Sequence, residues 1–300
     1  MKWILFCLCL LGSTLQARDL AISSLFKNEA PFLREWIEYH RMVGVEHFWL
    51  YNDNSTDNWQ EVLDPYIKEG LVEVFYWPAA SRSDYVGTQC RAFRDALNRA
   101  AGNTAWVALI DIDEFLLPMR NKTVPECLKE HFSEARAVYV SWRNFGTGSV
   151  RVPANEPFLG KLSACSFRGH PKNSSGKSIV RPTCVRYEDI WYPHHFPLIE
   201  PRKGYMNGDK EFMCCEGIDL KTDGKHHDKY IRINHYVLRD EHFYENVRLA
   251  RAKQGFGDGG LPLLLENHEL FSKLQDKKLI EFIQKNHPDK YEAIWKPYEK

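Results

Sequence analysis

The stretch Thr104-Ala-Trp-Val-Ala-Leu-Ile-Asp-Ile-Asp-Glu-Phe-Leu-Leu-Pro118 contains an apolar run that changes abruptly into acidic residues. The run from 106 to 110 is short and rich in Val, Ile and Trp, which predicts a buried central strand. Side chains two apart in a strand point the same way, so Asp111 and Asp113 are expected to direct their carboxylates to one point beyond the sheet. Hard oxygen ligands suit Mg²⁺ or Mn²⁺, ions that often hold substrate phosphates. The alternative is an acidic turn that binds no ligand.

Strands and helices alternate along the chain before this strand. This alternation predicts an α/β fold with a Rossmann-like, mostly parallel sheet and helices on both faces. Ligands bind such sheets at the carboxyl ends of the strands. The polar clusters 27–29, 52–57 and 111–114 all follow strands and are expected to line one crevice there. The expected strands are 19–26, 46–51, 71–77 and 106–110, and the expected helices are one that begins near Pro31 and ends at Gly44, 59–69 and 85–101.

The polar clusters supply candidate residues for binding a nucleotide. Asn28 and Glu29 are expected to contact its edge, although both also suit the start of a helix. Asp53 and Asp57 are expected to bind a base or ribose, with a plain polar turn as the alternative. Further along lie positive charges that could neutralise phosphate, or could belong to a solvated edge strand expected at 178–187. These are Lys177 and Arg181.

His235 lies in a strand expected at 229–238, where it alternates with Ile231, Ile233 and Val237. A histidine on such an apolar face is usually a hydrogen-bonded core residue. An imidazole is also a suitable third ligand for Mn²⁺ beside two carboxylates. Both interpretations remain open from the sequence.

The two ends of the chain differ in character from its centre. Residues 1–17 resemble a signal peptide, with Lys2 before an apolar segment that is short for a membrane span. We therefore expect entry into the secretory or export pathway, with an uncleaved anchor as the alternative and no other membrane contact. Residues 18–240 are expected to form the main domain, in halves 18–120 and 121–240, followed by a helical segment 241–300. The glycine-rich break at 255–260 is expected to be a lid or a connector.

The charge is balanced, with 40 basic and 40 acidic residues in 300. A balanced composition gives no sign of a nucleic-acid partner. Any charged ligand must therefore be bound by a local site.

Several short motifs follow one another over residues 20–255. Each motif alone is common, but their combination in this order is specific to one family. The motifs are Lys27-Asn-Glu-Ala-Pro-Phe-Leu-Arg-Glu-Trp-Ile-Glu-Tyr-His40, Gly44-Val-Glu-His-Phe48, Asp53-Asn-Ser-Thr-Asp57, Asp111-Ile-Asp-Glu-Phe-Leu116, Trp142-Arg-Asn-Phe-Gly-Thr-Gly148, Lys177-Ser-Ile-Val-Arg-Pro182, a histidine near 194–195, and Asn234-His-Tyr236 before a helix with Phe243.

In this combination the chain resembles the family 92 glycosyltransferases and their family 2-like bacterial relatives. The resemblance implies a GT-A fold whose first half, 18–120, binds the nucleotide and whose second half, 121–240, binds the acceptor. It implies a divalent metal, Mn²⁺ or Mg²⁺, at Asp111 and Asp113. We expect His235 as the third ligand, on the chemical ground given above. It also implies a nucleotide-sugar donor, a UDP-hexose such as UDP-galactose, and inverting transfer to a glycan or other hydroxyl acceptor.

Inverting transfer by single displacement needs one base near the acceptor hydroxyl. Glu188 and Asp189 are the expected candidates because they precede a loop rich in aromatic residues and histidine; Asp209 and Asp228 are the next candidates. Two other classes of protein fit the same features. One is a non-catalytic, secreted carbohydrate-binding protein on a degenerate transferase scaffold, and the other is a metal-dependent phosphohydrolase that uses the same carboxylates.

Overall fold

The computed structural model describes residues 17–153, 156–201, 204–216, 219–220, 222–253 and 260–295. Apart from Ala17, the predicted signal peptide lies outside these ranges, and so does the glycine-rich break apart from Gly260. Across the described residues, none of the helices combines the length and apolar character that crossing a membrane requires.

The first half of the chain forms four parallel strands with a helix after each of the first three. Its elements confirm the predicted alternation, with bounds that differ by one or two residues. They are β1 Arg18–Phe26, α1 Ala30–Met42, β2 His47–Asn52, α2 Trp59–Lys68, β3 Val72–Tyr76, α3 Tyr85–Ala100 and β4 Thr104–Leu109, and the strands stand in the order β3-β2-β1-β4.

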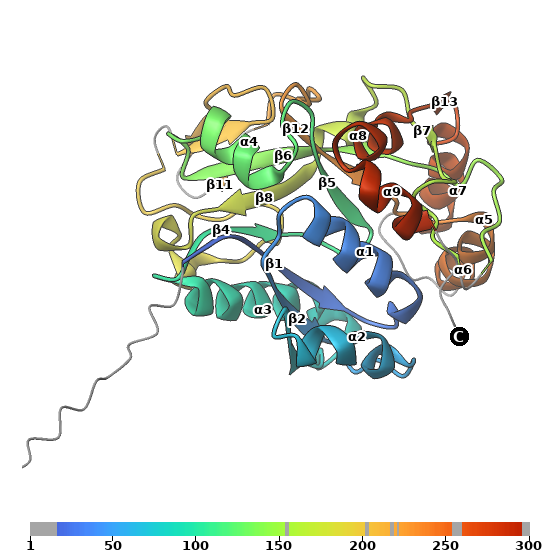
Figure 1. Ribbon diagram of the computed structural model, residues 1–300, viewed down its shortest axis with the longest axis horizontal. Helices are drawn as coiled ribbons and strands as arrows, with labels where there is room; N and C mark the ends of the chain where they lie inside the picture. Colours follow the sequence, from blue (N-terminus) through green and yellow to red (C-terminus); the bar gives the residue numbers. More distant parts are fainter. Residues whose placement is uncertain are drawn as a thin grey trace, which may run out of the picture.

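Helices cover both faces of this sheet (Figure 1). Alternate side chains of a strand point to opposite faces. Leu20 and Ile22 of β1 therefore pack in one apolar core with Leu33 and Trp36 of α1. Ala21 packs in the other core, with residues of α3. Both faces of β1 are thus buried, and exposed residues begin only after its carboxyl end, at Lys27 and Asn28.

The second half of the chain extends the same sheet, so a single layer of strands runs from β1 to β12. The full order is β3-β2-β1-β4-β8-β6-β12-β5, with β9 paired to β6. The pairs β4/β8, β6/β8 and β12/β5 are antiparallel and the others are parallel. This mostly parallel α/β sheet confirms the predicted fold class. The strands are β5 Glu114–Pro118, β6 Ala137–Asn144, β8 Gly176–Val180, β9 Tyr205–Asn207 and β12 Ile231–His235.

The remaining elements are short, and the carboxyl-terminal ones are helical (Figure 1). The chain after β12 changes helix type twice before the break, through a π-helical turn named η5. These elements are α4 Val124–His131, β7 Ala164–Cys165, β10 Cys215–Glu216, β11 Asp219–Leu220, α5 Glu241–Phe243, η5 Tyr244–Arg248, α6 Leu249–Lys253, α7 Gly260–Leu270, β13 Leu274–Gln275, α8 Lys278–Asn286 and α9 Pro288–Trp295, with 3₁₀ turns η1 Arg82–Asp84, η2 Pro171–Ser174, η3 Pro182–Cys184 and η4 Tyr187–Asp189.

Candidate active site

The Asp111-Ile-Asp113 sequence forms a tight turn between β4 and β5. The Glu114 backbone N–H donates to the Asp111 carbonyl at 3.1 Å, and the Asp111 backbone N–H donates to Glu114 Oε2 at 2.9 Å. The expectation that the two aspartates alternate along one strand was wrong, because the chain reverses at this point into β5. The turn still lies at the carboxyl end of β4, as predicted.

Asp113 is brought together with His235. The distance from His235 Nε2 to Asp113 Oδ1 is 3.7 Å. Strand β12 produces this proximity because it pairs with β5 in a register that sets His235 opposite Glu114. Burial lowers the pKa of His235 to about 4. Its imidazole is therefore neutral near pH 7, which is the form that binds a metal.

The orientation of the His235 ring is fixed by Asn144. The Asn144 amide nitrogen donates to the Lys172 carbonyl at 3.2 Å and to Asn173 Oδ1 at 2.9 Å, which leaves Oδ1 as an acceptor. Oδ1 lies 2.9 Å from His235 Nδ1, so that nitrogen carries the proton. The lone pair of Nε2 is then on the side of Asp113. A histidine held in this way by an outer partner is typical of metal ligands.

Asp111 is held by two other side chains. Its Oδ2 lies 3.0 Å from Lys177 Nζ, and its Oδ1 accepts a hydrogen bond from Gln89 Nε2 at 2.6 Å. Lys177 is 1% exposed. Burial alone would lower the pKa of Lys177, but Asp111 and Glu114 raise it above its usual value. The site therefore contains a permanently charged cation from β8, next to the acidic turn.

The predicted donor-binding residues of the first two loops do lie at the carboxyl edge, where they join the loops to each other. Asn28 Oδ1 accepts from the Thr56 backbone N–H at 2.7 Å, and Asp57 Oδ2 accepts from the Ala30 N–H at 2.8 Å. Asp53 Oδ1 accepts from the Ala79 N–H at 2.7 Å. These hydrogen bonds hold the loops in a defined shape. The oxygens of Asp53 and Asp57 named here therefore act as in a plain polar turn, which was the alternative interpretation.

Glu29 forms an ion pair across the site. Its Oε2 lies 3.0 Å from Nη2 of Arg239, which is itself buried. Burial raises the pKa of the Glu29 carboxyl more than the charge of Arg239 lowers it. The pair links the β1–α1 loop to the segment that follows β12.

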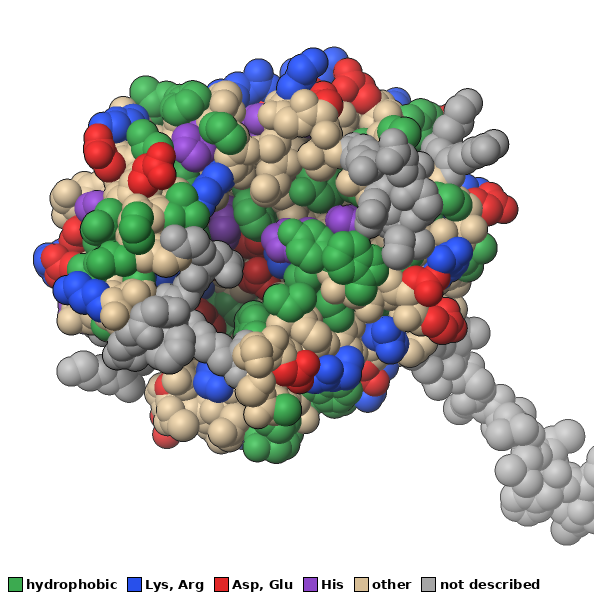
Figure 2. Space-filling view, turned by 180° about the vertical axis from the view of Figure 1, so that it is seen from behind, with side chains coloured by type: hydrophobic (Ala, Val, Ile, Leu, Met, Phe, Trp, Pro, Cys, Tyr) green, Lys and Arg blue, Asp and Glu red, His purple; other side chains and the backbone are tan. Residues whose placement is uncertain are grey.

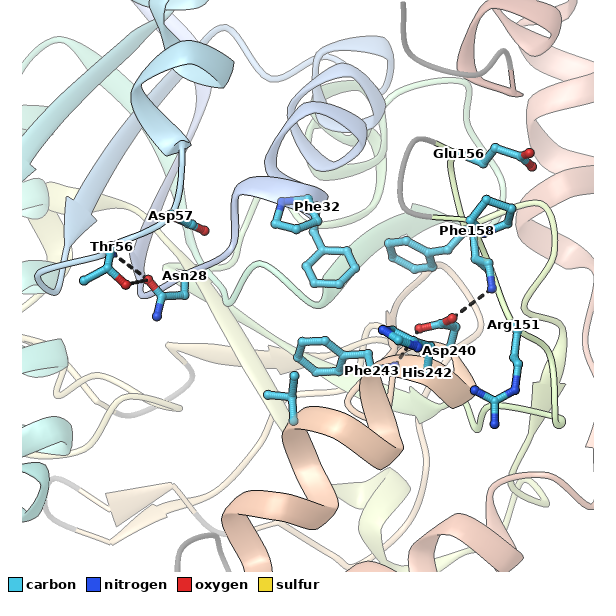
Figure 3. A pocket seen from close by; sticks show the side chains of 14 residues that line it. Asn28, Phe32, Thr56, Asp57, Arg151, Glu156, Phe158, Asp240, His242 and Phe243 are labelled. Carbon is cyan, nitrogen blue, oxygen red and sulfur yellow. Dashed lines mark hydrogen bonds between the residues drawn. The ribbon is translucent and has the colours of Figure 1, made fainter. Parts of the chain in front are cut away.

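A pocket of about 870 Å³ opens beside these loops (Figure 3). Its centre is apolar, because the rings of Phe32, Phe158 and Phe243 lie edge to face at 5.3 to 5.8 Å. Asn28 and Asp57 stand on one wall. The pocket therefore adjoins the predicted donor-binding loops.

One face of the molecule is hollowed, and acidic, basic and histidine side chains are gathered in the hollow (Figure 2). Apolar side chains stand on its rim. Side chains of these same three polar types make up the site around Asp113 and Lys177.

Arg181 is not part of the site. Strand β8 runs antiparallel to β4, so its beginning lies beside the acidic turn and the chain then runs away from that turn. Ser178 pairs with Leu109 at the end of β4, and Val180 pairs with Val107, further from the turn. The Arg181 guanidinium donates to the Ala135 carbonyl at 3.0 Å and lies 4.1 Å from the ring of Trp106. The structure therefore corrects the prediction that Arg181 binds phosphate.

The candidate bases Glu188 and Asp189 lie on the 3₁₀ turn η4. Asp189 pairs with Arg186, and the Glu188 carbonyl accepts from Arg94 at 3.4 Å. Within the described ranges, these contacts do not connect them to Asp113. Their role in catalysis remains a prediction.

Asp209 and Asp228 lie at the opposite end of the sheet. Asp209 follows β9, which pairs with the first residues of β6, whereas Asn144 ends that strand. Asp228 precedes β12 and pairs with Arg168 at 2.6 Å. This position excludes both as bases at the Asp113 site.

Four side chains at the site were missed in the sequence analysis. Asn144 and Gln89 look like ordinary polar residues in the sequence, and only their neighbours in space give them a role. Arg239 and Arg248 belong to the segment after β12, and Arg248 Nη2 lies 3.1 Å from Asp113 Oδ2. Arg239 could have been found from the sequence. It stands in Leu238-Arg-Asp-Glu-His-Phe243, which follows the Asn234-His-Tyr236 motif closely.

Curated proteins resemble this chain over stretches of different length. A rice protein of glycosyltransferase family 92 (Oryza sativa subsp. japonica) is 30% identical over 90% of this chain and 45% of its own length. A galactan beta-1,4-galactosyltransferase of Arabidopsis thaliana is 36% identical over 36% of this chain and 23% of its own length. The chain thus spans less than half the length of these curated relatives.

Among solved structures, residues 1–349 of S. aureus TarS are similar with a TM-score of 0.42 and 16% identity, covering 92% of this chain and 83% of that one. The sequence model of glycosyltransferase family 92 matches residues 20–217. That match takes in the parallel sheet, the acidic turn and Lys177, and it shows that this chain belongs to glycosyltransferase family 92.

Proposed function

We propose that this chain is a metal-dependent, inverting glycosyltransferase that moves a hexose from a UDP-sugar to a hydroxyl of a glycan or other acceptor. The observation that carries the proposal is the pair of Asp113 and His235, with the His235 lone pair on the carboxylate side. On a degenerate scaffold His235 would be a hydrogen-bonded core residue, and metal binding at Asp113 distinguishes the two cases.

The donor set of a carboxylate and an imidazole suits Mn²⁺, and Mg²⁺ is the alternative ion. Asp113 and His235 would hold the ion. When bound, it would neutralise charge that develops on the leaving diphosphate. Lys177 adds a fixed positive charge at Asp111, which favours the approach of an anionic donor.

Asp111 is better placed to contact the donor than to complete the metal pair. Both of its oxygens are directed to Gln89 and Lys177. A carboxylate held this firmly can accept a hydrogen bond from a ribose hydroxyl without reorganisation. The loops of Asn28 and Asp53 at the same sheet edge would then bind the rest of the nucleoside.

Galactose is the hexose we favour. The similarity to the Arabidopsis galactan beta-1,4-galactosyltransferase supports this choice, over the 117 residues that the two chains share.

Single displacement needs one base, and Glu188 or Asp189 would supply it. Their loop returns to the site at His194, whose Nδ1 donates to the Gly176 carbonyl at 2.8 Å, one residue before Lys177.

The leader supports a proposal about location. Residues 1–17 have a basic start and an apolar run, as an export signal has. We propose that the chain enters the secretory or export pathway.

Titration calorimetry with UDP, with and without Mn²⁺, tests the metal and the nucleotide together. We expect binding that depends on Mn²⁺. No metal-dependent binding at millimolar UDP would refute the proposed function. A panel of nucleotide sugars, scored for release of UDP or GDP, then names the donor. Release of inorganic phosphate from simple esters would instead identify a phosphohydrolase, and glycan binding that is independent of Asp113 would identify a binding protein.

A further inference from the structure

The guanidinium of Arg248 lies where a metal ion on Asp113 would compete with it. Its Nη2 is 3.1 Å from Asp113 Oδ2, while His235 Nε2 is 3.7 Å from Oδ1 of the same carboxylate. A divalent ion bound there would bring two further positive charges close to Arg248. Like charges at that separation repel strongly in a partly buried site. Metal binding is therefore expected to displace Arg248 from Asp113.

The segment that carries Arg248 is fixed at its start and can release the side chain at its end. Asp240 caps it by accepting from the Phe243 N–H at 3.0 Å, and Arg239 pairs with Glu29. Arg248 is the last residue of the π-helical turn η5, a geometry that is frequent at functional sites. Its side chain is 28% exposed, so it can move without opening the core.

Three guanidinium nitrogens of Arg239 and Arg248 lack an acceptor. Nε of Arg248 and both Nε and Nη1 of Arg239 are buried with no hydrogen-bond partner in the part of the chain that the structure describes. The Arg239 group also stacks 4.1 Å from the ring of Phe32. Buried donors without acceptors are costly. Guanidinium groups match the oxygens of phosphate in a bidentate way, so a diphosphate would satisfy such donors.

We propose that Arg248 is a ligand of the donor's diphosphate, and that its guanidinium occupies the metal's place at Asp113 until metal and nucleotide bind. This inference rests on the proposed function. Metal binding alone must break the Arg248–Asp113 ion pair, whereas the diphosphate offers the displaced guanidinium a new partner. Metal and nucleotide therefore strengthen each other's binding, and Arg248 carries part of this coupling.

The test compares Arg248→Ala and Arg248→Gln with the unchanged chain. Mn²⁺ affinity is measured first without nucleotide, and UDP and UMP affinities are then measured at saturating Mn²⁺. We expect both variants to bind Mn²⁺ alone about 10-fold more tightly and UDP about 10-fold more weakly, a change of about 1.4 kcal/mol in each case. UMP, which has one phosphate fewer, should be affected less than UDP.

Glu245→Gln is the matched control, because Glu245 anchors the same π-helical turn through Arg151 and does not contact Asp113. It should stay within about twofold of the unchanged chain in both measurements. A parallel loss of Mn²⁺ and UDP affinity in the Arg248 variants would mean a structural role and would overturn the inference, as would no change in either. If the unchanged chain itself binds no UDP with Mn²⁺, the proposed function and this inference both fail.

Discussion

His235 donates a hydrogen bond from Nδ1 to Oδ1 of Asn144 over 2.9 Å, although 91 residues separate the two in the chain. The parallel pairing of β6 and β12 makes this contact possible, because it sets His235 directly beside Asn144. The imidazole that we propose as a metal ligand is thus oriented by a residue of the neighbouring strand.

Replacement of Asn144 by Leu should weaken Mn²⁺ binding about 10-fold, since outer partners of metal-binding histidines typically contribute 10- to 100-fold. The ring would then lose the acceptor that holds its proton on Nδ1. Calorimetry or the electron paramagnetic resonance of Mn²⁺ measures the change. Ser166→Ala is the control, because Ser166 donates to Asn173 Oδ1 in the same network without contacting His235. Equal effects of the two changes would show that only the stability of the network matters.

Lys177 and Arg181 should behave differently when each is replaced by Met. Lys177 is buried against Asp111, so its loss leaves an uncompensated carboxylate and should cost about 3 kcal/mol of the free energy of unfolding, together with UDP binding. Arg181→Met should leave Mn²⁺-dependent UDP binding unchanged, because its guanidinium lies over Trp106 at the other edge of the sheet. Urea denaturation and calorimetry check the two quantities. Weaker UDP binding in Arg181→Met would restore Arg181 to the site.

The sequence predicted the first half of the fold well because short-range patterns determine it. Each of β1 to β3 precedes its helix, turn formers separate the elements, and apolar periodicity changes from strand to helix. The position of the polar loops at one edge then followed from the parallel topology. The sequence left two interpretations of His235 open, a core histidine or a third metal ligand, and its proximity to Asp113 became visible only in the structure.

What the sequence could not predict depends on chain reversal and on distant neighbours. The aspartates belong to a turn because Glu114–Pro118 pairs with β12, which follows more than 100 residues later. Lys177 and Arg181 belong to one motif, yet four residues along a strand span about 13 Å, enough to reach opposite edges. Arg248 meets Asp113 across 135 residues, and no local signal predicts such a contact.

His40 should make the protein less stable as the pH falls. It is fully buried, its Nδ1 donates to the Trp36 carbonyl, and its Nε2 accepts from the Leu116 N–H. Burial lowers its pKa from 6.5 to about 3. Below pH 6.5 the unfolded chain therefore takes up a proton that the folded chain does not, and unfolding becomes more favourable.

At pH 5 this uptake should lower the free energy of unfolding by about 2 kcal/mol. The value follows because pH 5 lies about 1.5 units below the pKa of 6.5 in the unfolded chain, and each unit corresponds to about 1.36 kcal/mol. Urea denaturation between pH 7 and pH 5 measures it. His40→Gln should be less stable at pH 7, with a shallower loss of stability on acidification. If both proteins lose the same amount between these values, His40 is not the group responsible.

The leader should be removed on export. Amino-terminal sequencing of the mature protein is expected to begin near Arg18, the first residue of β1. An intact Met1 in a soluble cytosolic fraction would contradict the predicted signal, and an intact Met1 in a membrane fraction would indicate an uncleaved anchor.

Asp113 and Asp209 offer the sharpest comparison, since each belongs to a group that could hold a cation. The ligand atoms of Asp209, Glu211 and His227 lie within 4.8 Å of one another. Both ring nitrogens of His227 are already paired with carboxylates, Nδ1 with Asp209 at 3.0 Å and Nε2 with Asp223 at 3.0 Å. Burial alone would lower the pKa of His227, but Asp223 and Asp209 raise it, which favours an imidazolium with no lone pair for a metal.

We therefore expect Asp113→Asn to reduce Mn²⁺-dependent UDP binding by more than 10-fold, because the amide removes the charge that holds the ion. Asp209→Asn changes a charge of the same kind at the opposite end of the sheet and should leave this binding within about twofold. Calorimetry with UDP and Mn²⁺ reads both variants, and circular dichroism confirms that each is folded. The reverse result would move the metal site to Asp209 and its neighbours, and would separate it from Lys177 and the donor-binding loops.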